Sequence, residues 1–285
     1  MATTTISRVR IPRRFLRRFG LLRVRGPDYA PWLRNEPTPP PQPSGFSIGP
    51  PDFIGVGAQK AGTTYWFHLI ADHPDVYQPA GRRPELHFWD RFSHAWPTAD
   101  DIARYHRLFP RPPGSVTGEK TPEYMAYYWI PPMLKEAAPD ARILILLRDP
   151  IERYRSAAAH GADKGWDRTA GNEQMMFERG LYAGQIARIL DTFGPERVLI
   201  LQYERCIRDV PTELARTYGF LGLAPHVPPD AVLSRPRNVS RVAKAPIDPQ
   251  RLALLRRRYE AEVKRVRDSV PDLDLSLWPN FAQLD

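Results

Sequence analysis

Short apolar runs alternate with amphipathic stretches along most of the chain. Three runs lack polar alternation and are typical of buried parallel strands: Phe53–Gly57, Arg142–Leu147 and Arg197–Leu201. Helical spacing is found over four longer stretches: Gly62–Ala71, Leu181–Phe193, Pro211–Leu221 and Pro249–Val270. Strands that alternate with helices predict an α/β fold, a three-layer sandwich with a central parallel sheet.

The pattern begins only at Asp52, which divides the chain into two parts. Residues 1–51 form a basic, proline-rich N-terminal extension, and residues 52–285 form one predicted catalytic domain. In the extension, apolar residues from Ile11 to Leu22 recur at helical spacing between arginines. This segment is either an amphipathic helix on an anionic membrane or partner, or a solvated arm.

The charge of the chain is concentrated in that extension. Of the net +9, residues 1–36 carry +7 through nine arginines against Asp28 and Glu36, and the remainder carries only +2. The body therefore lacks the basic surface typical of nucleic-acid binding. The single cysteine, Cys206, excludes an internal disulfide, and no apolar run reaches 18 residues. These features predict a bacterial cytoplasmic protein, which contacts a membrane peripherally only if the extension forms the amphipathic helix.

A glycine-containing loop follows the first strand. Gly57 and Gly62 have the spacing of a nucleotide triphosphatase loop, Gly-x-x-x-x-Gly-Lys-Ser/Thr, and Thr64 supplies its hydroxyl. Thr63 occupies the usual lysine position, and the lysine is instead Lys60. Backbone N–H groups in such a turn bind anions. A lysine that projects from the loop suits a 5′-phosphosulfate, whose bridging oxygen gains negative charge as the sulfuryl group leaves.

This loop resembles that of the P-loop sulfotransferase superfamily, which commonly reads Lys-x-Gly-Thr-Thr/Ser. The resemblance covers most of residues 52–280 and is strongest to the branch of heparan sulfate sulfotransferases and their bacterial relatives. It implies a P-loop-like nucleotide site for the donor 3′-phosphoadenosine 5′-phosphosulfate (PAPS). The loop residues that it implies as donor contacts are Gln59, Lys60, Ala61, Gly62, Thr63 and Thr64.

A second motif follows the second apolar strand. Arg148 stands at the strand end, where a planar guanidinium can bind phosphate, and Ser156 lies two helical turns further on. The segment resembles the family's motif Leu-Arg-Asp/Asn-Pro-x-x-Arg-x-x-Ser, which implies that both residues bind the 3′-phosphate of the donor. Asp149 and Arg153 are expected to organise the turn and the helix.

Glu85 and His87 lie between these motifs, and a carboxylate near a histidine is typical of general acid–base chemistry. The heparan-type branch has Lys-Glu-x-His-Phe-Phe here. The resemblance implies that Glu85 takes the acceptor proton, with His87 as a second candidate or as the residue that orients it. Pro84 replaces the family's lysine, and Arg82 or Arg83 is expected to supply the missing charge.

Lys120 belongs to a segment similar to the family's Glu-Lys-Ser/Thr-Pro-x-Tyr, predicted to follow a short strand. The resemblance implies that Lys120 faces the sulfuryl group or the acceptor and that Tyr124 lines the cleft. A second cation opposite Lys60 would balance charge on the sulfuryl oxygens. Further aromatic residues are expected to contact the acceptor: Phe88, Trp89, Tyr127, Tyr128 and Trp166.

A basic loop late in the chain, residues 234–241, lacks hydrophobic periodicity. In the resembling family a loop at this place closes over the 3′-phosphate and the adenine. This implies Asn238 and Arg241 as donor contacts, although the family's Lys-x-x-Gly element is absent.

Together these motifs predict in-line sulfuryl transfer from PAPS to a carbohydrate, glycolipid or natural-product hydroxyl, with 3′-phosphoadenosine 5′-phosphate (PAP) as product. The sequence shows no cluster with metal-ligand spacing, so no metal requirement is expected. Two alternatives remain open: a P-loop phosphotransferase or nucleotide hydrolase, and a catalytically inactive membrane-associated binding protein.

Overall fold

The computed structural model describes residues 36–93, 95–167, 169–234 and 245–284. Within them, four parallel strands form one sheet in the order β2-β1-β3-β4. The strands are β1 Phe53–Gly57, β2 Gly118–Lys120, β3 Arg142–Leu147 and β4 Val198–Gln202. The three predicted strands are confirmed, with β4 beginning one residue later. The segment around Lys120, predicted to follow a strand, is itself strand β2.

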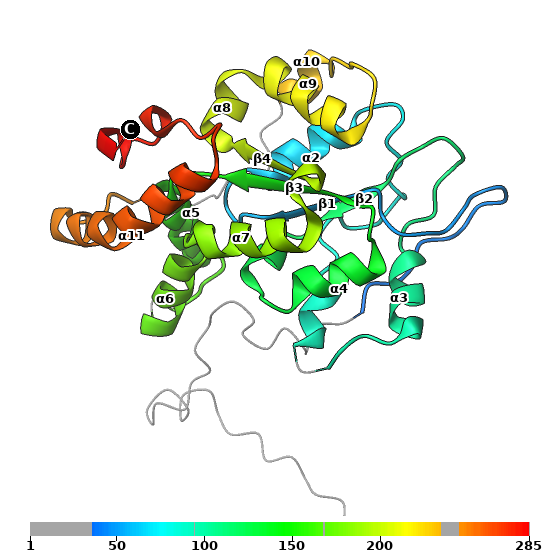
Figure 1. The fold of residues 1–285 in the computed structure, drawn as a ribbon, viewed down its shortest axis with the longest axis horizontal. Coiled ribbons are helices and arrows are strands. Elements are labelled where there is room, and N and C mark those ends of the chain that lie inside the picture. The colour runs from blue at the N-terminus through cyan, green and yellow to red at the C-terminus, as the bar shows by residue number, and fades with distance from the viewer. Residues whose placement is uncertain (1–35, 94, 168, 235–244, 285) are drawn as a thin grey trace, which may run out of the picture.

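Helices cover both faces of this sheet, as the three-layer prediction requires (Figure 1). Helices α2, α8, α9 and α10 lie above the sheet in this view, and α4 and α7 lie below it. The helices are α2 Thr63–Ala71, α3 Ala99–His106, α4 Ile130–Ala137, α5 Pro150–Asp163, α6 Ala170–Glu178, α7 Tyr182–Phe193, α8 Tyr203–Arg208, α9 Val210–Leu221, α10 Asp230–Leu233 and α11 Pro249–Ser269. The predicted helix ends are correct to within about one residue.

The strand order places the two motifs predicted to bind phosphate at the centre of the sheet. β1 and β3 pair directly, so the loop after β1 and the turn after β3 leave the same edge side by side. The chain adds β2 on one side of β1 and then β3 on the other side, so the direction in which strands are added reverses between β1 and β3. Ligands of open α/β sheets bind at such a switch point, beyond the carboxyl ends of the strands.

The start of α5 is fixed by local chemistry that the sequence indicates. Pro150 occupies the first turn, and the Asp149 carboxylate accepts hydrogen bonds from the N–H groups of Ile151 and Glu152 at 2.8 and 3.2 Å. The other Asp149 oxygen accepts from the backbone and side-chain nitrogens of Asn280, both at 3.0 Å. Asp149 therefore has the structural role predicted for it.

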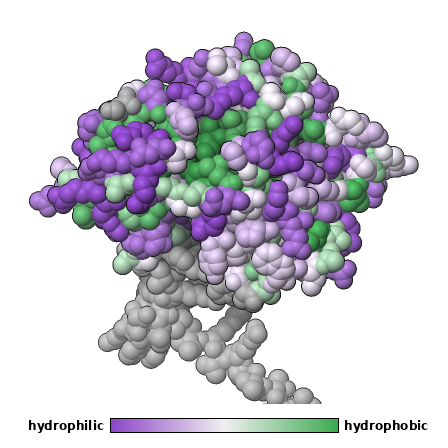
Figure 2. All heavy atoms as spheres, in the orientation of Figure 1, coloured by the Kyte–Doolittle hydropathy of each residue, from purple (hydrophilic) through white to green (hydrophobic). Residues whose placement is uncertain are grey.

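The apolar side chains of the strands and inner helix faces form one continuous core. Hydrophilic side chains dominate the visible surface, and hydrophobic ones show mainly in a hollow near its centre (Figure 2). Among the described helices, none is long and apolar enough to cross a bilayer. The N-terminal segment for which membrane contact is predicted lies outside the described residues.

Glu119 is a charged residue inside this core. It is fully buried in β2, where its carboxylate accepts hydrogen bonds from the hydroxyls of Tyr105 (2.7 Å) and Thr121 (2.8 Å). Burial raises the pKa of Glu119 from 4.5 to about 6, despite these hydrogen bonds and the charges of Arg82 and His87. The folded protein therefore binds this proton more tightly than the unfolded chain does.

This burial predicts a pH-dependent stability. The contribution of Glu119 is fully present below pH 4.5 and is lost as the pH rises through about 6. At about 1.4 kcal/mol for each pH unit between 4.5 and 6, the loss is about 2 kcal/mol. Denaturant unfolding at pH 5 and pH 8 measures the part of this loss that lies above pH 5, about 1.4 kcal/mol. In Glu119→Gln the difference between these two pH values should shrink by about that amount, and an unchanged difference would contradict the assignment.

Candidate active site

The loop between β1 and α2 has the geometry of an anion-binding turn. Lys60 and Gly62 both have left-handed backbone conformations, with φ of 70° and 87°. Gly62 is the N-cap of α2, and no side chain caps the first turn of the helix. Its first N–H groups therefore point outward from the edge of the sheet, where the positive end of the helix dipole favours an anion.

Gly62 is required at its position for two reasons. Its φ of 87° disfavours any residue with a Cβ, and a Cβ would lie 2.6 Å from Cδ2 of Tyr203. We expect Gly62→Ala to destabilise the fold by about 1–2 kcal/mol or more and to weaken PAP binding at least ~10-fold. Gly184→Ala is the matched control, because that helical glycine has open space around it. It should raise the thermal midpoint without changing PAP affinity; equal effects of both variants would contradict the account.

Arg148 lies beside this loop. Its Nη1 donates to the backbone oxygen of Lys60 at 3.2 Å, and its guanidinium lies 4.5 Å from the ring centroid of Tyr203. The side chain is 9% exposed, and its Nε is buried without a hydrogen-bond partner among the described residues. A buried, unpartnered guanidinium N–H beside an anion-binding loop fits a phosphate oxygen.

Lys120 joins the loop to the candidate base. Its Nζ donates to the Thr64 hydroxyl at 2.8 Å and forms an ion pair with Glu85. Lys120 is 2% exposed, whereas the Glu85 side chain is 39% exposed. The contact arises because β2 pairs with β1, with Lys120 opposite Gly55. The structure therefore brings together one buried cation and one accessible carboxylate at the end of the donor loop.

The charges of this pair are strongly coupled. Burial raises the pKa of Glu85, but the hydrogen bonds and charges of His87 and Lys120 outweigh it and lower the pKa to about 2. Burial lowers the pKa of Lys120, and Glu85 opposes that shift. Glu85 is thus an ionised carboxylate at neutral pH, able to accept a proton.

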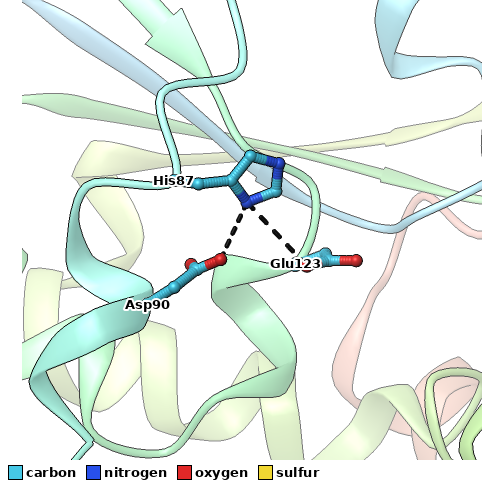
Figure 3. Close-up of side chains that lie close together, drawn as sticks. All are labelled: His87, Asp90 and Glu123. Atoms are coloured by element: carbon cyan, nitrogen blue, oxygen red, sulfur yellow. Dashed lines mark hydrogen bonds and ion pairs between the residues drawn. The ribbon is translucent and has the colours of Figure 1, made fainter. Parts of the chain in front are cut away.

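His87 lies among the carboxylates of Glu85, Asp90 and Glu123, and Figure 3 shows the last two of them. Its Nδ1 is 2.8 Å from Asp90 Oδ2 and 3.8 Å from Glu123 Oε2, and its Nε2 is 3.8 Å from Glu85 Oε2. Asp90 is fully buried, and its contact with Nδ1 holds the imidazole ring in place. The opposite nitrogen, Nε2, faces Glu85, so His87 can orient that carboxylate.

The same cluster is the group among the described residues that could hold a metal ion, since single donor atoms of His87, Asp90 and Glu123 lie within 4.8 Å of one another. The Glu123 carboxylate, however, already accepts from Arg179 at 2.8 Å. The guanidinium of Arg179 therefore already balances part of the negative charge of this cluster.

Comparison with known proteins agrees with this geometry. Residues 88–227 match the model of the Sulfotransferase family. The chain is 31% identical over 188 residues to heparan sulfate glucosamine 3-O-sulfotransferase 3B1 of Mus musculus, covering 61% of this chain and 46% of that protein. It is 29% identical over 195 residues to heparan sulfate glucosamine 3-O-sulfotransferase 6 of Homo sapiens, covering 61% and 52%. Both comparisons therefore show similarity of this chain to sulfotransferases, the family model over residues 88–227.

The fold also matches a solved structure. The sulfotransferase from Alicyclobacillus acidocaldarius superposes with a TM-score of 0.65 at 24% identity, covering 81% of this chain and 99% of that one. This confirms the predicted α/β fold. The chain spans about half the length of the curated relatives it matches.

Several residues predicted to line the site lie elsewhere. Tyr124, expected to line the cleft, is fully buried, and its hydroxyl accepts a 3.0 Å hydrogen bond from the N–H of Phe88. Phe88 and Trp89, expected to contact the acceptor, are also fully buried. These three aromatics pack the segment that carries Glu85 against the core, because each has more to gain from burial than from a polar cleft.

Arg82 does not supply the charge missing at Pro84. Its guanidinium donates to the backbone oxygens of Gly118 and Leu108 and to the side chain of Gln78. It therefore stabilises the start of β2. The cation beside Glu85 is Lys120 instead. Asn238 and Arg241, the predicted donor contacts of the late loop, lie outside the described residues.

Two aromatic residues of the donor site were missed in the sequence. Tyr203 follows β4, packs against Gly62 and carries the Arg148 guanidinium on its ring. Tyr65 lies in the first turn of α2, and its hydroxyl donates to the backbone oxygen of Leu233 at 2.9 Å. A tyrosine directly after a buried strand is a signal that could have pointed to Tyr203, since ligands bind at strand ends.

His160 was also missed. It lies one helical turn after Ser156 on the same face of α5, and its ring packs edge-on against Trp166 with centroids 5.7 Å apart. Burial lowers the pKa of His160, and the charges of Lys60 and Lys164 lower it further, whereas Asp163 and Glu85 oppose the shift. His160 is therefore a further titratable group that the charges of Lys60 and Glu85 influence.

Proposed function

We propose that the chain is a sulfotransferase that transfers a sulfuryl group from PAPS to an acceptor hydroxyl. The observation that carries the proposal is the bridge formed by Lys120, which contacts Thr64 of the donor loop and Glu85 at once. A triphosphatase loop would also have a lysine directly before its Ser/Thr, where this chain has Thr63. A group transfer between a bound donor and an acceptor hydroxyl needs a base such as an accessible carboxylate.

The donor fits the described residues. The outward N–H groups at the start of α2 and the Lys60 side chain would hold the 5′-phosphosulfate. Arg148, with its unpartnered Nε, and Ser156 would hold the 3′-phosphate. The donor supplies an activated sulfuryl group, and these residues fix its orientation.

Glu85 would take the proton of the acceptor hydroxyl as that oxygen attacks sulfur, while the bond from sulfur to the bridging oxygen breaks. Its pKa of about 2 makes it a weak base while Lys120 holds it. Once Lys120 shares its charge with the sulfuryl oxygens, it holds Glu85 less tightly, and the carboxylate becomes a stronger base. Asp90 would keep His87 oriented toward Glu85 during this step.

Charge balance at the site comes from side chains in this proposal. Lys60, Lys120 and the α2 dipole offset the charge that develops on the leaving phosphate, so no metal is assigned a role. The matched relatives are named for heparan sulfate glucosamine. The acceptor class proposed here is therefore a carbohydrate hydroxyl, with glycolipids and natural products as further candidates.

Transfer of ³⁵S from labelled PAPS tests the proposal. Incubation with N-sulfated glucosamine oligosaccharides, simple glycolipids and phenols in the presence of EDTA should yield labelled product and PAP with at least one of these acceptors. A protein that binds PAPS but labels none, and that instead hydrolyses adenosine triphosphate with magnesium, would contradict the proposal.

A further inference from the structure

Glu123 is a buried carboxylate that the proposed chemistry does not use. It is 6% exposed and lies three residues beyond Lys120. Its Oε1 accepts hydrogen bonds from Gln59 Nε2 at 2.9 Å and from Arg179 Nη1 at 2.8 Å. Its Oε2 faces Nδ1 of His87 at 3.8 Å (Figure 3).

These contacts connect four segments of the chain. Gln59 belongs to the donor loop, Glu123 to the segment after β2, His87 to the segment that carries Glu85, and Arg179 to the end of α6. Arg179 is only 8% exposed and makes an ion pair with Glu123. A buried ion pair of this kind adds little net stability, because desolvation of both charges offsets their attraction. The role of this ion pair therefore follows from the segments that it connects and not from its contribution to the free energy of unfolding.

The end of β2 and the segment after it contact the donor loop at its two ends. Lys120 holds Thr64 where the loop enters α2, and Glu123 holds Gln59 where the loop leaves β1. Between these two contacts the loop adopts its left-handed conformations at Lys60 and Gly62. Lys120 also serves the reacting groups in the proposed chemistry, whereas Glu123 is given no role in it and contacts Gln59, Arg179 and His87. A side chain of this kind can fix the loop before the donor arrives.

We propose that the Glu123–Arg179 ion pair is a positioning element for donor binding, which acts through the side chain of Gln59. Arg179 holds the carboxylate in place, the carboxylate holds Gln59, and Gln59 fixes the start of the loop whose N–H groups receive the 5′-phosphosulfate. The inference rests on the proposed function, because it assigns the loop to a PAPS-type donor.

A double-mutant cycle with PAP affinity as its readout tests this inference. The ion pair is removed as Glu123→Leu/Arg179→Met, which leaves no uncompensated buried charge. The pair is removed once in the wild-type background and once in Gln59→Ala, and PAP binding is measured by calorimetry. We expect a loss of ~10-fold in the wild-type background and less than ~2-fold in Gln59→Ala, because the pair acts through Gln59.

Other outcomes separate the two levels of the account. Equal losses in both backgrounds, or no loss in either, would overturn the positioning role and leave the proposed function intact. Failure of folded wild-type protein to bind PAP would overturn the proposed function itself.

A matched control distinguishes positioning from general destabilisation. Glu262 is as buried as Glu123, at 4% exposed, and its Oε1 accepts from the N–H of Ala183 at 2.5 Å where α11 meets α7. Glu262→Gln should lower the thermal midpoint and leave PAP affinity within ~2-fold of wild type. If Glu262→Gln weakens PAP binding as much as removal of the Glu123–Arg179 pair, loss of stability explains both and the inference fails.

Discussion

Replacement of Glu85 by glutamine should lower the turnover of sulfuryl transfer by ~10²–10⁴-fold and leave PAP affinity within ~2-fold of wild type. The amide keeps the shape of the side chain but cannot take the proton of the acceptor. Glu85 contacts Lys120 and His87 rather than the donor loop itself, so donor binding should survive. Initial rates of ³⁵S transfer at saturating PAPS, together with PAP calorimetry, measure the two effects separately.

A control for this variant is Glu260→Gln. Glu260 pairs with Lys264 at 2.7 Å on the exposed face of α11, so its replacement removes an ion pair away from the site. Its turnover should match wild type. If Glu85→Gln also retains wild-type turnover, another group takes the proton and the assignment of Glu85 is wrong.

Replacement of Arg148 by alanine should weaken PAP binding by ~30-fold or more, which corresponds to about 2 kcal/mol. The expectation follows from its buried guanidinium, its unpartnered Nε and its contact with the loop at Lys60. Arg148→Lys should recover only part of the loss, because an ammonium group cannot reproduce the planar fork on Tyr203. Calorimetric titration with PAP gives both values.

Arg216→Ala serves as the control for Arg148. Arg216 pairs with Asp272 at 2.6 Å on the exposed side of α9 and should not affect PAP binding. Unchanged PAP affinity in Arg148→Ala would remove the 3′-phosphate site from its predicted place at the end of β3.

The sheet and the donor loop could be predicted because their signals are local. Phe53–Gly57 and Arg142–Leu147 are buried along their length, and a parallel strand buried on both faces appears in sequence as a continuous apolar run. Once the strand ends are known, the positions of Gly57, Gly62 and Arg148 follow. The two glycines belong to the loop at the end of β1, and Arg148 directly follows β3. Short-range patterns therefore determine the donor half of the site.

The other half depends on contacts between residues far apart in the sequence. Lys120 contacts Glu85 and Thr64 only because β2 pairs with β1. A strand of three residues is too short for the sequence to predict that pairing or its register. The partnership of Glu123 with Gln59 and Arg179 spans 64 and 56 residues. Tyr124 was expected in the cleft because of the family resemblance, and the sequence does not show whether its ring faces the cleft or the core. In the structure the Tyr124 side chain is fully buried in the core.

The measurement that tests the central claim most directly is calorimetric titration of the wild-type protein with PAP in the presence of EDTA, beside a titration with adenosine triphosphate and magnesium. The account predicts micromolar binding of PAP without added metal and much weaker binding of the triphosphate. Folded protein that ignores PAP and binds adenosine triphosphate with magnesium would contradict the account and favour a phosphotransferase.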